Sequence, residues 1–273
     1  MYIALTFVLI LLALVFHELG HALAMRKYGI RVETLGIGIP MNPKITFHPK
    51  IGKKLFGEQF SLVLSPWLLG AFVKSSGDDS DFEKKLPYQA AAHIYGAGIV
   101  ANLAYASLLI SIFAIMTVGD ANVLTRGIIP LGISLFVAYL LIRFSRQFCA
   151  WILPLLSLAA IAVFTYSIWD SVMVHHDEKA LGGIVTASIM VTDYVKDASH
   201  AILFGFAISL GLAILNALPF YPLDGGHIAQ LIFRGRFEKF SIALKFAGGA
   251  IVFLLIAMSV YTDIRQVIHL FMS

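Results

Sequence analysis

The stretch Tyr2–Met25, YIALTFVLILLALVFHELGHALAM, is apolar except for a cluster of titratable side chains in its second half. A bilayer core about 30 Å thick is crossed by a helix of roughly 20 mostly apolar residues, so this stretch is long enough to span a membrane. It has no basic region at its start, and its polar residues lie inside the apolar run, unlike those of a cleaved secretory signal. We therefore expect a retained transmembrane helix over residues 2–25.

The composition of the whole chain also indicates a membrane protein. Hydrophobic residues make up 59% of the 273 residues and charged residues 13%, about half of the ~25% that is usual in soluble domains. The net charge of +4 is too small to indicate a nucleic-acid-binding protein. A single cysteine, Cys149, excludes both an intramolecular disulfide and a cysteine-based zinc cluster. The expected partner is thus the lipid bilayer, with no nucleic acid.

Five further stretches approach the length of a membrane span: residues 94–118, 128–142, 148–169, 201–218 and 242–261. The stretch 128–142 is short, because at 1.5 Å per residue it covers only about 22 Å. It could be tilted, re-entrant or extended beyond these bounds. We predict an all-α polytopic membrane protein with about six transmembrane helices, forming a single integral-membrane domain over residues 1–273.

Lys and Arg residues are concentrated in three of the connections between these helices, within residues 26–85, 143–146 and 234–245. Cytoplasmic loops carry an excess of Lys and Arg, so these connections are expected on the cytoplasmic side. The alternate connections contain few basic residues. We therefore predict a multi-pass protein of the cell membrane with both termini outside.

The segment 31–74 is too polar to span a membrane but contains two strand-like patterns. Ile45–His48 and Phe60–Leu64 alternate or are rich in β-branched residues, and Pro and Gly lie around them. We predict a small membrane-associated β-hairpin or sheet at the cytoplasmic interface.

His17-Glu18-Leu19-Gly20-His21 is an H-E-x-x-H sequence on the first predicted helix. Residues four apart lie on one helix face, so two imidazoles can hold zinc while the neighbouring carboxylate reaches a water molecule. Glu18 lies about 12 Å inside the boundary marked by Arg26, where an ionisable group is costly unless it is paired. A bound divalent cation would supply the missing counter-charge. The alternative is a pair of polar interfacial histidines beside a snorkelling glutamate.

A catalytic zinc site needs a third protein ligand, and the best candidate is Asp224. It lies in Asn216–Gly226, NALPFYPLDGG, where two prolines must interrupt the fifth predicted helix. Irregular backbone at membrane depth is tolerated where it is buried or lines a wet cavity. We expect Gly225 and Gly226 to form a tight reversal that aims Asp224 inward. His227 is an alternative ligand, and a solvated Pro/Gly loop is the alternative structure.

These two motifs resemble the signature motifs of the site-2 proteases, which are intramembrane zinc metalloproteases. The resemblance implies that His17, His21 and Asp224 hold one Zn²⁺, that Glu18 is the catalytic base and that Asn216 lies near the substrate backbone. Gly98-Ile99-Val100-Ala101-Asn102 is similar to the family's G-P-x-x-N, with Ile99 in place of Pro. Asn102 lies within an apolar helix, so we expect its amide to form a structural or active-site hydrogen bond.

The middle of the chain differs from the best-known bacterial members of that family. Where those members carry PDZ domains, this sequence has two apolar stretches and a polar loop. The resemblance implies an intramembrane endopeptidase that cuts transmembrane or membrane-anchored proteins. The alternatives are a catalytically inactive relative and a zinc-binding transporter. Glu18 distinguishes them, because a transporter needs no base beside its ligands.

Overall fold

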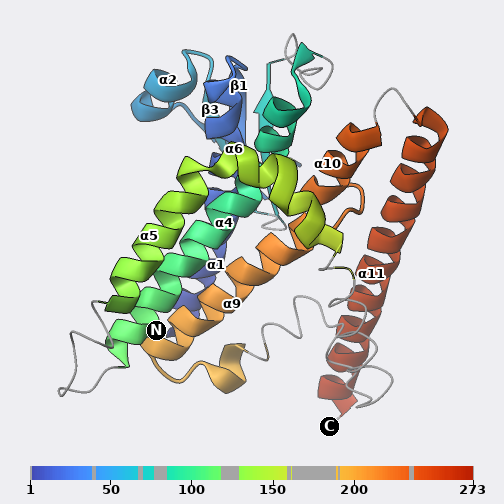
Figure 1. Ribbon diagram of the computed structural model, residues 1–273. Coiled ribbons are helices and arrows are strands. Elements are labelled where there is room, and N and C mark those ends of the chain that lie inside the picture. The colour runs from blue at the N-terminus through green and yellow to red at the C-terminus, as the bar shows by residue number, and fades with distance from the viewer. Residues whose placement is uncertain are drawn as a thin grey trace.

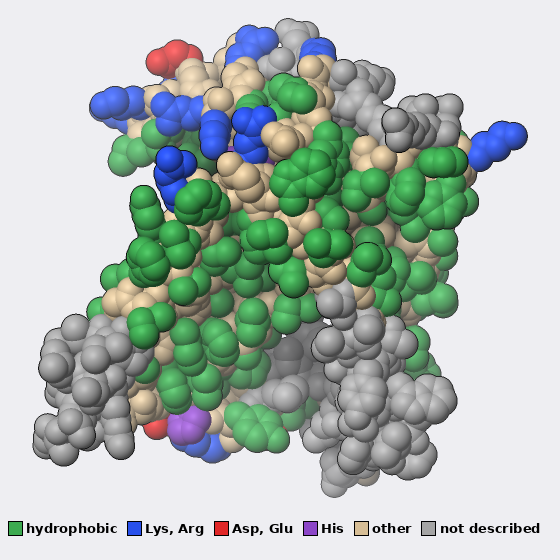
Figure 2. Space-filling model, in the orientation of Figure 1, with side chains coloured by type: hydrophobic (Ala, Val, Ile, Leu, Met, Phe, Trp, Pro, Cys, Tyr) green, Lys and Arg blue, Asp and Glu red, His purple; other side chains and the backbone are tan. Residues whose placement is uncertain are grey.

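The computed structural model describes residues 2–38, 41–66, 70–76, 85–117, 129–158, 161, 189, 191–233 and 237–272. Long helices form the body of the molecule, and a small sheet lies at one end of them (Figure 1). The N and C labels of Figure 1 both lie at the opposite end. Figure 2 shows hydrophobic side chains over the helical body, with Lys and Arg gathered at the sheet end. This distribution is typical of a protein whose helices lie in lipid.

Among the described residues, four helices are long and apolar enough to cross a membrane. They are α1 (Tyr2–Lys27), α4 (Tyr88–Met116), α9 (Ala198–Ala217) and the greater part of α11 (Glu238–Met272). They confirm the predicted helices over residues 2–25, 94–118, 201–218 and 242–261. Helix α4 begins earlier than predicted because Ala90, Ala91 and Ala92 are strong helix formers and are buried in the core.

The two predicted helices in the middle of the chain do not appear as two straight spans. Helices α5 (Ile129–Arg143) and α6 (Ser145–Gln147) and the π-helix η3 (Phe148–Ile152) follow one another. Leu131–Arg143 and Ser145–Leu158 are apolar enough to cross a membrane only as a pair, and they are bent by 68° at Phe144. The described helices thus give four spans, or up to five. The predicted helix 148–169 is described to residue 158 and at residue 161, and its remainder lies outside the described residues.

The predicted hairpin is part of a larger mixed sheet, with strand order β2-β3-β1-β4. Strands β2 (Ile45–Phe47) and β3 (Ser61–Leu64) are antiparallel, as predicted, and helix α2 (Lys50–Phe56) connects them. Strand β1 (Val32–Ile37) runs parallel to β3, and β4 (Ala71–Ser75) pairs antiparallel with β1. The prediction did not include β1 and β4, whose short sequences VETLGI and AFVKS show no regular alternation of polar and apolar residues.

Helix α4 lies at the centre of the molecule, and α1, α5, α9 and the short helix α10 (Asp224–Phe233) all pack against it. Small residues allow the closest of these contacts. A Cβ on Gly20 of α1 would lie 2.9 Å from the Cβ of Ala101 and against the carbonyl oxygen of Ala97, both on α4. Close backbone contact at small residues is the usual way in which helices associate in lipid. It fixes α1, which carries the H-E-x-x-H motif, against α4.

Candidate metal centre

His17 and His21 lie on the face of α1 that packs against α4, and both side chains are buried. Their Nε2 atoms are 3.1 Å apart, and the two rings meet edge to face. Gly98 of α4 makes room for them, since a Cβ there would lie 2.7 Å from both Nε2 and Cε1 of His17 and against Nε2 of His21. Any larger residue at position 98 would displace the imidazoles.

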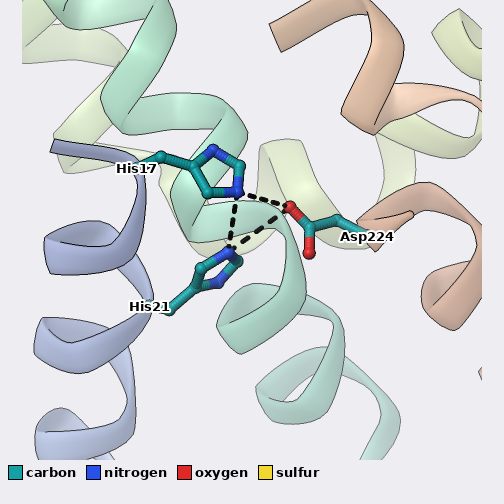
Figure 3. A group of neighbouring side chains, drawn as sticks. All are labelled: His17, His21 and Asp224. Carbon is teal, nitrogen blue, oxygen red and sulfur yellow. Dashed lines mark hydrogen bonds and ion pairs between the residues drawn. The ribbon is translucent and has the colours of Figure 1, made fainter. Parts of the chain in front are cut away.

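Asp224 reaches the two histidines from the other end of the sequence. Helix α9 ends at Ala217, the chain turns through residues 218–223, and α10 begins at Asp224 itself. The Oδ2 atom of Asp224 lies 3.2 Å from Nε2 of His17 and 3.4 Å from Nε2 of His21. Figure 3 shows the two rings and the carboxylate pointing toward one another. The three residues predicted as metal ligands are therefore brought together.

The predicted reversal lies in residues 218–223, just before Gly225 and Gly226, and not at the two glycines themselves. Both residues lie in the first turn of α10, and neither has a positive φ. Their small size is needed for another reason. A Cβ on Gly225 would collide with the carbonyl group of Ala217, and a Cβ on Gly226 would lie 2.5 Å from the backbone of Phe220 and Tyr221. The two glycines let α10 fold back tightly on the turn that precedes it, and this brings Asp224 to the histidines.

The spacing of the three ligand atoms fits a zinc ion. Tetrahedral zinc with N and O ligands at about 2.1 Å holds those ligands about 3.4 Å from one another. The three distances here are 3.1, 3.2 and 3.4 Å. In addition, Oδ2 of Asp224 is buried and accepts no hydrogen bond. A cation between the three groups would provide the partner that this oxygen lacks.

Further hydrogen bonds orient both imidazoles. Nδ1 of His21 lies 2.7 Å from the carbonyl oxygen of Ile94, which can only accept, so the His21 ring donates through Nδ1 and leaves Nε2 free for a metal. Nδ1 of His17 lies 3.2 Å from the side-chain amide of Asn102. Ser209 of α9 donates to the backbone oxygen of Asn102 at 2.9 Å. The predicted hydrogen bond of Asn102 is confirmed, whereas no sequence signal pointed to the carbonyl of Ile94.

Glu18 is half-buried beside this group and accepts a hydrogen bond from the backbone N–H of Val73 in β4. Helix α1 and strand β4 are in contact. The strand bonded to Glu18 is thus β4, which the sequence did not predict. A carboxylate held close to the ligands of a metal is placed to exchange protons with a water molecule there.

Asn216 and His227, the other two residues considered in the sequence, are not part of the ligand group. Asn216, in the last turn of α9, donates from Nδ2 to the carbonyl oxygen of Leu212 at 3.0 Å. The His227 ring stacks on Tyr95 with centroids 4.4 Å apart and an interplanar angle of 9°. The group of ligand atoms that lie within 4.8 Å of one another contains His17, His21 and Asp224. His227 is not part of it.

Comparison with known proteins also points to a zinc metalloprotease. The family model of Peptidase family M50 matches residues 5–259. A Campylobacter jejuni protein named "putative zinc metalloprotease" is 36% identical over 98 residues, which are 34% of this chain and 27% of that protein. A Helicobacter pylori protein of the same name is 23% identical over an alignment of 354 residues, covering 96% of this chain and 99% of that protein.

A Synechocystis protein, also named "putative zinc metalloprotease", is 34% identical over 80 residues, 28% of this chain and 21% of its own length. The Campylobacter and Synechocystis matches therefore cover about a quarter of those proteins. The Helicobacter alignment is longer than this chain, so it includes segments that have no counterpart here. The family match extends over most of the sequence, including both motifs that supply the three ligands. The chain therefore belongs to Peptidase family M50, the family of the site-2 proteases.

Proposed function

We propose that this protein is a zinc-dependent intramembrane endopeptidase. One observation carries the proposal: His17, His21 and Asp224 converge at distances that fit zinc, with Glu18 beside them, among helices apolar enough to lie in a bilayer. A bound zinc ion acidifies water and polarises a scissile carbonyl group. Glu18 takes the proton from the attacking water and passes it to the leaving amine. The substrates we propose are transmembrane or membrane-anchored proteins, including regulators that the cut releases.

The position of β4 supports a way of holding the substrate. Strand β4 is at the edge of the described sheet. Gly38 donates to the oxygen of Gly70, and the N–H of Ser76 donates to the oxygen of Arg31, so alternate residues from Gly70 to Ser76 bond toward β1. Ala71 and Val73 lie between them and direct their backbone groups to the other edge, where Val73 already bonds Glu18.

A peptide that is to be cut must be unwound first, because a helix uses its carbonyl groups in internal hydrogen bonds. In our proposal the unwound segment is added as a strand along the free edge of β4, with its backbone bonded to Ala71. Its scissile carbonyl then lies beside Glu18. Asn216 is proposed to bond the substrate from the opposite side, by exchanging its present bond to Leu212 for one to the substrate backbone.

The proposed topology places the sheet and the metal centre toward the cytoplasm and both termini outside. The excess of Lys and Arg at the sheet end supports this orientation, since basic residues are retained on the cytoplasmic side. The N and C labels at the opposite end of Figure 1 agree with termini on one side of the membrane.

The decisive experiment expresses the protein with candidate single-span substrates in a host that lacks related proteases. Wild type is compared with Glu18→Gln, which keeps the three metal ligands, and the zinc content of both purified proteins is measured. We expect equal zinc in the two proteins and cleavage by the wild type alone. Zinc in both proteins without cleavage by either would instead identify a non-proteolytic relative, and zinc flux into vesicles that is equal in both would identify a carrier.

A further inference from the structure

A groove lies between α1, α4 and α5. Its cavity volume is about 500 Å³. The floor consists of small residues of α1 and α4, among them Gly20, Ala97 and Ala101, and the walls consist of larger ones such as Phe16 and Leu135. Both α1 and α5 pack against α4, and the groove lies where the three meet. It is accordingly lined almost entirely by apolar side chains of membrane helices.

The groove is long enough to hold an extended acyl chain. Its lining on α4 extends from His93 to Leu108, which is about 22 Å at 1.5 Å per residue.

The polar end of the groove is positively charged. Lys27, His93 and Ser145 line that end. Both nitrogens of His93 are already in hydrogen bonds, with Tyr28 at 3.0 Å and with Ser145 at 2.8 Å. Lys27 is exposed, and among the described residues it forms no ion pair. Arg146 is close enough to act electrostatically on the same imidazole as Lys27. This end of the groove therefore has an excess of positive charge, which an anionic group would balance.

We propose that the groove binds a phospholipid with an anionic headgroup. One acyl chain lies in the groove, and the phosphate lies against Lys27 and Arg146 at the sheet end, where basic residues between helices attract anionic headgroups. Gly20 lines the groove and lies between His17 and His21 on α1. The lipid therefore packs against the helix that carries two of the metal ligands.

The test measures phospholipid retained by the full-length protein after exhaustive detergent exchange, and the rise in Tm when dioleoyl phosphatidylglycerol or dioleoyl phosphatidylcholine is added. Ala138→Phe fills the groove from α5, and Val137→Phe places the same side chain on the adjacent, exposed position that does not line it. We expect wild type and Val137→Phe to retain about one phosphatidylglycerol per chain and Ala138→Phe to lose most of it. Ala104→Leu, on α4, fills the groove independently should Ala138→Phe fail to fold.

The headgroup is tested by Lys27→Gln, with its exposed neighbour Arg26→Gln as the control, since Arg26 does not line the groove. We expect Lys27→Gln to reduce the preference for phosphatidylglycerol over phosphatidylcholine roughly fivefold, the usual effect of one basic residue at an anionic membrane surface. Equal lipid retention by Ala138→Phe and Val137→Phe would overturn the proposal. So would an absence of headgroup preference in the wild type, or a retained hydrophobic peptide in place of lipid. None of these measurements depends on proteolysis.

Discussion

At the scale of single residues, the metal centre depends on the missing side chain of Gly98. Gly98→Ala places a methyl group within 2.7 Å of the His17 ring and against His21, and the rings cannot move away because α1 is packed closely on α4. We expect zinc affinity to fall on the order of tenfold or more. Metal analysis of the purified protein measures this loss. Gly132→Ala, at a helical glycine with nothing within 4 Å, should bind zinc like the wild type.

Asn102 is the second residue whose effect can be measured separately from the ligands. It is fully buried, and its Oδ1 atom has no hydrogen-bond partner although its amide contacts Nδ1 of His17. A metal at Nε2 requires a proton on Nδ1, which an oxygen must then accept. Asn102→Ala should weaken zinc binding about 10- to 100-fold. Asn102→Asp, which also presents an oxygen, should recover most of it, and a competition titration with a chromophoric chelator would show whether it does.

At the scale of secondary-structure elements, α11 holds the turn that precedes Asp224. Lys245 lies over the Tyr221 ring at 4.4 Å, and a Cβ on Gly248 would lie 2.6 Å from the backbone nitrogen of Tyr221. Gly249, next along the helix, has nothing within 4 Å. Gly249→Ala should therefore stabilise α11 by about 1 kcal/mol through helix propensity alone. Gly248→Ala should lower both thermal stability and zinc affinity, and a gain like that of Gly249→Ala would refute this contact.

Helix α9 begins at a cap that responds to pH. Asp197 accepts hydrogen bonds from the hydroxyl of Ser199 and the backbone N–H of His200, and these bonds lower its pKa from 3.8 to about 2. Because the folded-state pKa is depressed, the cap stabilises the helix above pH 3.8 and is lost as the pH falls toward 2. The protection of the first-turn amides of α9, measured against their intrinsic exchange rates, should fall over this range. In Asp197→Asn, which keeps a capping oxygen, this protection should not change over the same range.

The elements also show where sequence-based prediction reached its limit. The apolar runs that became α1, α4, α9 and α11 were predictable because each is long enough to cross lipid. A break near Phe144 was predicted from Arg143 and Arg146, but its angle of 68° was not, because the angle between two helices depends on tertiary packing. Strand β4 could not be placed beside Glu18, because strand order depends on tertiary packing. Gly225 and Gly226 were recognised as important, but the close approach that requires them exists only in the folded chain.

At the scale of the whole molecule, folding and metal binding should be linked. Zinc that binds only the folded state raises its stability by about 4 kcal/mol at a free concentration about a thousandfold above Kd. Removal of zinc with a chelator should therefore lower the Tm of the wild type, and added zinc should restore it. His17→Ala and Asp224→Asn should respond to neither treatment. A wild-type Tm that does not respond to either would argue against a metal held between α1 and α10.

The proposed orientation can be tested by labelling introduced cysteines. Cys149 is the only cysteine and is buried, so introduced cysteines can be labelled over a low background. Lys54→Cys, in the sheet region, should react with a membrane-impermeant maleimide only after cells are opened. Ser199→Cys, at the other end of the molecule, should react in intact cells. The reverse pattern would place the metal centre on the outer side.

The third ligand comes from a segment about two hundred residues after His21 in the chain. While the ribosome is still making the protein, α1 is inserted with its two histidines, but the carboxylate that completes the centre has not yet been synthesised. On the proposed function, a nascent chain at this stage could not yet cleave other proteins. The proposed proteolysis could begin only when α9 and α10 are in place, so the order of synthesis would itself guard against premature cleavage.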